Sequence, residues 1–183
     1  ERTFEVKWLN FAKDLMEISF ELFSDEESGF FFYTEKNTEL IARKMEINDN
    51  VIPSSNSLMA KNLWTLGVFF SNEVYLERSR QMLSNIYSSM SSYGSGYSNW
   101  AQLALRFQKE FKELAIVGGD SLTHLNKLNR TYIPNAVIAG GTEENIPFLE
   151  HRLGEKTAFY ICQNRSCKTP IYDFDEMMQS FIN

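Results

Sequence analysis

The densest group of chemically capable side chains in this sequence lies between residues 48 and 57. It includes Asp49, Asn50, Ser54 and Asn56, which offer a carboxylate, two carboxamides and a hydroxyl directly before an apolar segment. Two interpretations stay open. The segment is either a capped helix start stiffened by a proline, or a polar loop facing a cavity. In the second case Asp49 is the candidate catalytic residue, as acid, base or hydroxyl acceptor.

The groups that proteins use to hold sugars also occur here. Tyr33 ends an aromatic run, and Asn99 and Trp100 add a carboxamide and a ring. Aromatic residues at helical spacing are more often core than binding platform, so the rings alone indicate little. With that alternative open, we expect a substrate site at one end of a helical assembly, formed by Tyr33, Asn50, Ser54, Asn56 and Trp100.

The two cysteines do not have the spacing of a metal or redox motif. Four residues separate Cys162 from Cys167, whereas zinc knuckles and thioredoxin-type pairs have two. The only histidines, His124 and His151, stand at no ligand spacing from each other or from a cysteine. The sequence predicts reduced thiols or at most a labile pair, no metal, and no cofactor.

Two glycine pairs, residues 118–119 and 140–141, each follow a short apolar run. Backbone amides at such a turn can hold an anion. Neither pair completes a phosphate-binding loop or a dinucleotide fingerprint, and glycine is also the residue that turns tightly, so the structural interpretation is favoured.

Helical periodicity dominates residues 1–110. Two adjacent sets of apolar residues follow the first helix, which indicates contacts on two sides. The first set is Phe4, Trp8, Phe11, Leu15, Ile18 and Leu22, and the second set is Leu9, Ala12, Met16, Phe20 and Phe23. Residues 30–34 favour a strand, and residues 39–45 a short helix or a second strand. Helices 59–70 and 75–90 predict an antiparallel hairpin, followed by a helix over 97–107.

After residue 110 short apolar runs alternate with helical segments. Strands are expected at 114–117, 136–139 and 157–162, and helices after residue 120 and over 173–182. This alternation predicts a small α/β unit with parallel strands over residues 111–183.

Composition excludes several classes of function. A net charge of −6 and a pI near 5.0 argue against a nucleic-acid surface. The apolar runs are too short to span a membrane, and low cysteine use favours the cytoplasm. The chain begins at Glu1 with a helix soon under way and no signal peptide, so we expect it to be part of a longer protein.

Several segments together resemble a known family. They are Gly-Phe-Phe-Phe-Tyr-Thr at 29–34, Leu-Ile-Ala-Arg-Lys at 40–44, residues 49–57, Ala-Ile-Val-Gly at 115–118, and the Cys-x4-Cys-x2-Pro pattern ending at Pro170. In this order they are similar to the C-terminal part of the thioredoxin-domain-containing YyaL family, whose animal member is a spermatogenesis-associated protein. That family usually has glycine where this chain has Asn50 and Ser55.

The resemblance implies a thioredoxin-like domain outside this chain, followed by an (α/α)6 toroid similar to N-acylglucosamine 2-epimerases and six-hairpin glycosidases. We therefore expect a mainly α fold, with residues 1–110 as a helical-hairpin segment of the toroid. The implied function is a carbohydrate-active or sugar-binding protein of unestablished reaction. The alternative is a non-catalytic scaffold that presents the thioredoxin-like domain to protein partners. A toroid segment would leave helix faces uncovered, so we also expect self-association through Phe4, Trp8 and Phe11.

Overall fold

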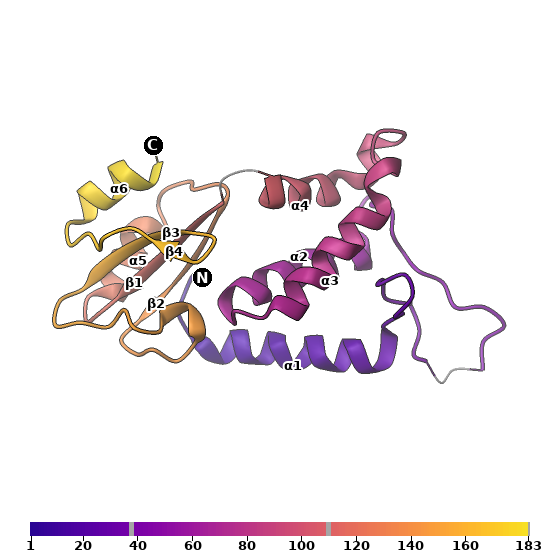
Figure 1. The fold of residues 1–183 in the computed structure, drawn as a ribbon, viewed down its shortest axis with the longest axis horizontal. Helices are drawn as coiled ribbons and strands as arrows, with labels where there is room; N and C mark the ends of the chain where they lie inside the picture. The colour runs from indigo at the N-terminus through magenta and orange to yellow at the C-terminus, as the bar shows by residue number, and fades with distance from the viewer. Residues whose placement is uncertain (37–38, 109–110, 183) are drawn as a thin grey trace. The chain divides into compact units, whose positions relative to one another are not determined.

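The structure, a computed structural model, describes residues 1–36, 39–108 and 111–182. It divides into two compact units. One is helical and comprises residues 7–68 and 72–108, and the other, the α/β unit, comprises residues 1–6, 69–71 and 109–183. Figure 1 shows the helices α1–α4 in the first and the sheet with α5 and α6 in the second.

The helical unit contains α1 (Val6–Phe23), α2 (Ser55–Phe69), α3 (Glu73–Ile86) and α4 (Ser98–Gln108). Short 3-10 turns, η1 (Tyr87–Ser89) and η2 (Gly94–Tyr97), connect the last two helices. The predicted hairpin of α2 and α3 is confirmed: the Ser79 hydroxyl donates to the Ala60 carbonyl at 2.7 Å, and the start of α3 is capped by Asn72. The core of the helical unit consists largely of buried side chains from α2, α3 and α4: Leu63, Trp64, Leu66, Met82, Leu83, Ile86, Trp100 and Leu103.

Residues 30–34 do not form the predicted strand. Phe31 makes only an isolated bridge with Ser24. The Asn56 carboxamide accepts from the Phe31 N–H at 2.7 Å and donates to the Phe31 carbonyl at 2.9 Å. One side chain thus satisfies the backbone groups that a neighbouring strand would have paired. Residues 39–45 are likewise irregular, and residues 37 and 38 lie outside the described range.

The α/β unit contains a four-stranded sheet in the order β2-β1-β3-β4. The strands are β1 (Lys112–Val117), β2 (Ala136–Gly141), β3 (Ala158–Gln163) and β4 (Ser166–Cys167). Helix α5 (Ser121–Leu128) connects β1 to the parallel strand β2, while a 3-10 turn, η3 (Pro147–Leu149), precedes β3 and α6 (Phe174–Ile182) closes the chain. β3 runs antiparallel to β1 and β4 antiparallel to β3, so the expectation of an all-parallel unit is wrong.

One hydrophobic cluster joins the sheet of this unit to both of its helices, and Phe4 packs against it from the N-terminal segment. Its buried members are Leu114, Ile116, Leu128, Phe159, Ile161, Met177 and Phe181.

The expected mainly α, toroidal fold is wrong, and with it the likeness to six-hairpin glycosidases. The described residues form six α-helices and a four-stranded mixed sheet rather than a ring of helix pairs. The physical reason lies in α1. The second set of apolar residues on this helix packs inward, with Met16 3% exposed, but Trp8 and Phe11 of the first set are 58% and 56% exposed. Two apolar stripes on a helix therefore did not mean two neighbouring helices.

Candidate functional site

The carboxylate of Asp49 lies between the N-termini of two helices. One oxygen, Oδ1, accepts from the backbone N–H of Ser54 at 3.0 Å and from the Ser57 hydroxyl at 2.7 Å, at the start of α2. The other, Oδ2, accepts from the backbone N–H of Asn99 at 2.8 Å, in the first turn of α4. Free N–H groups and the helix dipole both favour a negative charge at these positions. One buried side chain therefore joins two helix starts.

The electrostatics of Asp49 follow from these bonds. Burial alone would raise its pKa, but hydrogen bonds from Ser54, Ser57 and Asn99 stabilise the charged form, and the net result is a lowered pKa. An ionised carboxylate that already accepts three hydrogen bonds is a poor proton donor. The arrangement fits a structural anion better than a general acid.

Ser54 and Asn56 complete the loop as backbone partners. The Ser54 hydroxyl accepts from the Ser57 N–H at 3.1 Å, which makes Ser54 the N-cap of α2, and donates to the Ile47 carbonyl at 2.8 Å. Asn56, fully buried, uses its carboxamide to bind the backbone of Phe31 and the Glu46 carbonyl. The polar density of residues 48–57 is therefore used inside the protein.

The remaining predicted site residues divide between core and solvent. Trp100 is fully buried, donates from Nε1 to the Ile47 carbonyl at 2.8 Å, and meets the Phe30 ring edge-on. Tyr33 is 69% exposed and Asn50 is exposed as well. The structure thus places Asp49, Ser54, Asn56 and Trp100 around this loop and leaves Tyr33 and Asn50 facing water.

Sequence reasoning missed Lys61. Its ammonium donates to the side-chain oxygens of Asn99 at 2.9 Å and Gln102 at 3.0 Å, so α2 binds α4 beside the Asp49 cluster. Burial lowers the pKa of Lys61, and so does the Arg106 charge, whereas Asp49 opposes the shift. These partners lie 38 and 41 residues away, and no local sequence pattern indicates the pairing.

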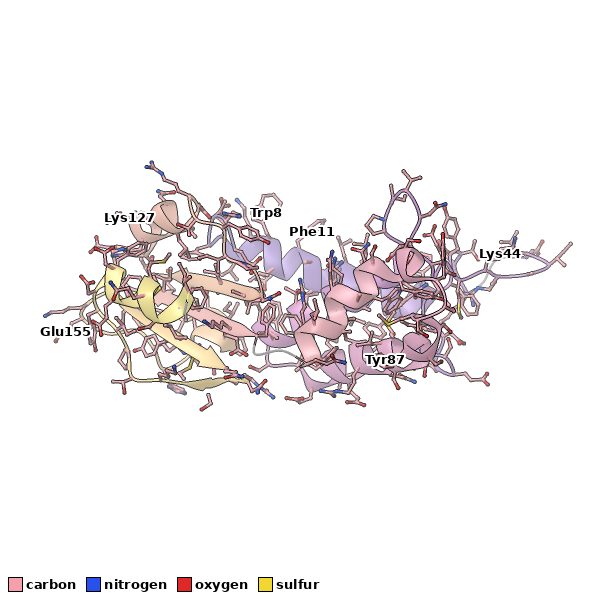
Figure 2. All side chains as sticks on the ribbon, turned by 90° about the horizontal axis from the view of Figure 1, so that it is seen from above. Trp8, Phe11, Lys44, Tyr87, Lys127 and Glu155 are labelled. Atoms are coloured by element: carbon pink, nitrogen blue, oxygen red, sulfur yellow. A yellow bond between two sulfur atoms is a disulfide. The ribbon has the colours of Figure 1, made fainter. Side chains whose placement is uncertain are left out.

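An apolar surface runs along α1. Trp8, Phe11, Leu15 and Ile18, here called the outer stripe, are between 48% and 58% exposed. Figure 2 shows the Trp8 and Phe11 side chains projecting from the helix. A groove of about 450 Å³ adjoins the stripe at Leu15 and separates α1 from α2. Its other lining residues are mainly apolar: Leu9, Ala12, Met16, Ser19, Met59, Asn62, Thr65 and Leu66.

The glycine pairs have structural roles. Gly118 has a φ of +133°, and a Cβ there would collide with the backbone of Thr157; at Gly140 it would collide with the Ile116 carbonyl. Only glycine fits where backbones approach so closely. Within the described ranges, no three His, Cys, Asp or Glu side chains gather as a metal site would require, and no helix is long and apolar enough to cross a membrane.

Cys162 and Cys167 form a disulfide between β3 and β4, so of the two expected alternatives the reduced thiols are wrong, and the labile pair stays a prediction. The chain folds back between them in a tight hairpin, with Asn164 and Arg165 at positive φ. This reversal places the two cysteines directly opposite each other in the sheet register. The four-residue spacing therefore closes a disulfide across a hairpin.

Comparison with known proteins gives a consistent result. The chain is 27% identical to spermatogenesis-associated protein 20 of Homo sapiens and of Rattus norvegicus, and 26% identical to that of Mus musculus. Each similarity covers 94% of this chain but 24% of the relative, so the chain spans about a quarter of the length of these proteins. No family model matches it. The similarity extends over nearly the whole chain and supports a relationship to the spermatogenesis-associated protein 20 family.

Proposed function

We propose that the helical unit is a non-catalytic docking module whose outer stripe receives an amphipathic helix. The observation that carries the proposal is the exposure of Trp8, Phe11, Leu15 and Ile18 on one face of α1. Their 3-4-3 spacing matches one helix face, and an apolar face of this kind commonly marks an interaction site. The adjoining groove along α2 widens the surface that a partner helix would cover.

Charge indicates what kind of helix fits. Asp14 and Glu21 are exposed and stand three residues after Phe11 and Ile18, so they flank the second half of the stripe along one edge. Lys7 occupies the same edge beside Trp8, at 5.1 Å from its ring. Lysine or arginine residues along the matching edge of a partner would face these carboxylates. The occupant is therefore an apolar-faced helix with a basic edge. This chain matches 24% of the length of its human relative. We propose that the helix belongs to a segment corresponding to the other three quarters of such a protein.

A sugar-binding role through the Asp49 loop has less support. Asp49, Ser54 and Asn56 already bind protein groups, and Trp100 has no exposed face to offer a sugar ring. Tyr33 and Asn50 remain as exposed groups for such a role. Thermal melts of the protein with a panel of monosaccharides and disaccharides test it, and a sugar-dependent rise in Tm would revive it.

Tryptophan fluorescence tests the docking proposal directly. Trp64 and Trp100 are buried, 6% and 0% exposed, so a change in emission on binding reports mainly Trp8. The probe is a synthetic amphipathic peptide of leucine and lysine at helical spacing. We expect a blue shift on titration, and binding at least about tenfold weaker when glutamate replaces lysine in the peptide.

Matched variants separate docking on the outer stripe from non-specific hydrophobic binding of the peptide. The double variant Trp8→Tyr, Phe11→Ser tests the stripe. Because this variant lacks the Trp8 reporter, its binding is measured by the fluorescence polarisation of a labelled peptide. Val74→Ser, Tyr87→Ser removes two apolar side chains of similar exposure elsewhere in the helical unit, 71% and 55%. Loss of binding only in the first variant supports the proposal. Equal binding by both variants, or by both peptides, would contradict it.

A further inference from the structure

A guanidinium group packs directly on the Cys162–Cys167 disulfide. Arg152 Nη2 lies 3.0 Å from the Cys167 sulfur and 3.8 Å from the Cys162 sulfur. The ion pairs found among the described residues do not include Arg152, and its Nη1 is buried without a hydrogen-bond partner. The cation therefore faces sulfur, and among the described residues no carboxylate lies within ion-pair distance, although the charges of Glu113 and Glu144 act on it from further away.

The position of Arg152 is built by several contacts. Oε1 of Glu144 accepts from the backbone N–H groups of Arg152 at 2.8 Å and Leu153 at 2.7 Å. The Tyr160 hydroxyl donates to the Arg152 carbonyl at 3.0 Å. The guanidinium lies over the Phe148 ring at 5.2 Å and the Tyr160 ring at 5.9 Å. These contacts come from the loop before β3 and from β3 itself, so the cation is held in place before any reaction.

The two sulfurs differ in access. Cys162 lies in β3 and is 2% exposed, whereas Cys167 lies in the two-residue strand β4 and is exposed. Disulfide exchange requires a thiolate to approach one sulfur in line with the bond that breaks. Cys167 is the exposed member of the pair, so it is the sulfur that a thiolate from solvent reaches first, with Cys162 as the leaving group.

We infer that Cys162–Cys167 is a thiol–disulfide exchange site that takes a dithiol as its reductant. A thiolate of the dithiol attacks the Cys167 sulfur, a new S–S bond forms, and the Cys162 thiolate departs. The second thiolate of the dithiol then attacks its own first sulfur and releases the Cys167 thiolate. The dithiol loses two electrons and two protons and closes to a disulfide, and the cysteine pair gains them.

Arg152 gives this site its chemistry. A cation beside a cysteine lowers the pKa of its thiol, and a thiol of lower pKa leaves faster. Because Nη2 contacts both sulfurs, the guanidinium stabilises the thiolate that forms in each step. A disulfide that served only to staple the hairpin would have no need of a half-buried cation in contact with its sulfurs.

The first test measures the rate at which dithiothreitol reduces the oxidised protein at pH 7, with alkylation and mass spectrometry as the readout. Arg152→Met keeps the apolar packing on Phe148 and removes the charge, and it should slow reduction about tenfold. Arg152→Lys should retain most of the rate. Arg165→Met, which removes a hairpin cation, should leave the rate nearly unchanged. Equal rates for the wild type and Arg152→Met would overturn the inference.

The second test needs no variant. The pH dependence of iodoacetamide alkylation of the reduced wild-type protein should reveal a thiol that ionises about one pH unit or more below an ordinary cysteine, near 8.5. Glutathione disulfide added to the reduced protein, quenched before resolution, should be trapped on Cys167. Two ordinary thiols, or a mixed disulfide found mainly on Cys162, would contradict the proposed order of steps.

A third measurement identifies the source of the dithiol. A reduced protein with a Cys-x-x-Cys pair replaces dithiothreitol at equal concentration. Faster reduction by the protein assigns a protein dithiol, and faster reduction by dithiothreitol assigns a small one. Failure of both to reduce the pair without denaturant would leave a purely structural disulfide and end the inference.

Discussion

Among the described residues, each unit of the molecule buries one carboxylate, and burial ends in opposite pKa shifts for the two. Asp49 in the helical unit is 3% exposed and Glu113 in the α/β unit 5%. Burial acts against the charge of both, yet the pKa of Asp49 is lowered and that of Glu113 is raised. Asp49 accepts from three donors at two helix starts, whereas Glu113 accepts from one donor found in the described part of the chain, the backbone N–H of Arg165, at 3.3 and 3.2 Å to its two oxygens.

The difference shows that the number of hydrogen-bond donors, more than burial, decides the direction in which the pKa of a buried carboxylate shifts. In the helical unit the donors are backbone groups that helix formation leaves free, so the charge stabilises the fold. In the α/β unit strand pairing has already used most backbone groups around β1, and Glu113 meets few donors. The unit also holds the Arg152 guanidinium on a disulfide, with its Nη1 buried and without a hydrogen-bond partner. The buried charge of the helical unit is fully used in holding the fold, whereas the α/β unit keeps a cation beside a group that can react.

The largest predicted effect is the loss of the Asp49 carboxylate. Asp49→Ala leaves three donors unsatisfied at two helix starts and should lower the free energy of unfolding by about 3 to 5 kcal/mol. Urea denaturation at pH 7 measures it. The neighbouring Asn50→Ala, at an exposed position, is the control and should stay within about 0.5 kcal/mol of the wild type. An Asp49→Ala variant with the same free energy of unfolding as the wild type would mean that the carboxylate serves a ligand and not the fold.

The same carboxylate sets an acid dependence. Because the folded pKa of Asp49 lies below the unfolded value of about 3.9, its contribution is complete above that pH. The contribution is lost as the pH falls through the lowered folded value. The stability difference between the wild type and Asp49→Asn should therefore shrink in strong acid, as urea titrations at a series of pH values would show.

The second effect concerns the carboxamide that replaces a strand partner. Asn56→Ala should cost about 2 to 3 kcal/mol, because the buried N–H and carbonyl of Phe31 lose their partner. Asn56→Asp should cost at least as much, since a carboxylate cannot donate to the Phe31 carbonyl. Chemical denaturation measures both. A negligible cost for Asn56→Ala would show that Phe31 finds another partner and would weaken the contrast between the units.

A smaller change, in the opposite direction, is predicted for Glu113. Its raised pKa means that the folded state holds the proton more tightly, so stability declines as pH rises from about 4.3 through the folded pKa. Glu113→Gln can still accept from Arg165 and removes that penalty. It should stabilise the protein by about 1 kcal/mol at pH 7, with the gain vanishing near pH 4. Destabilisation at pH 7 would show that Arg152 and Arg165 stabilise the charged form more than burial opposes it.

Much of the local structure was predictable because it depends on nearby residues. Helical periodicity located α1 to α4, and the strand preference of short apolar runs located β1 to β3. The N-cap Ser54 was also predictable, since a cap acts within three residues. The carboxamide of Asn56 could not be foreseen as the partner of Phe31, 25 residues away, so the aromatic run was misread as a strand.

The errors in predicting tertiary arrangement also arise from contacts between residues that lie far apart in the sequence. The second oxygen of Asp49 binds Asn99, 50 positions along the chain, and no pattern within residues 48–57 indicates it. The direction of β3 depends on how the loop over residues 142–157 returns to the sheet, which the composition of the strand does not determine. Apolar spacing marks the faces of α1 but cannot tell a face covered within this chain from one that stays open. The toroid, which the family resemblance implied, was therefore compatible with the pattern although the fold is different.

The smallest effect on stability is predicted for the outer stripe of α1, and it isolates the open surface from the core. Phe4 and Trp8 belong to the same predicted set of apolar residues. Phe4 packs against the sheet cluster of the α/β unit, whereas Trp8 is 58% exposed. Trp8→Ser should therefore change the free energy of unfolding by less than about 0.5 kcal/mol, while Phe4→Ser should cost about 2 kcal/mol or more.

The same pair of variants separates stability from association. If the stripe also pairs with a second copy, sedimentation velocity of the wild type should show a concentration-dependent rise in the weight-average coefficient. Trp8→Ser should suppress that rise with no loss of stability, because it removes exposed apolar area without disturbing packed side chains. Phe4→Ser should lower stability, and any association that it causes should follow unfolding rather than the stripe. A wild type that sediments as a monomer at every concentration would show that the outer stripe does not pair with itself, and would leave a helix of different sequence as its occupant.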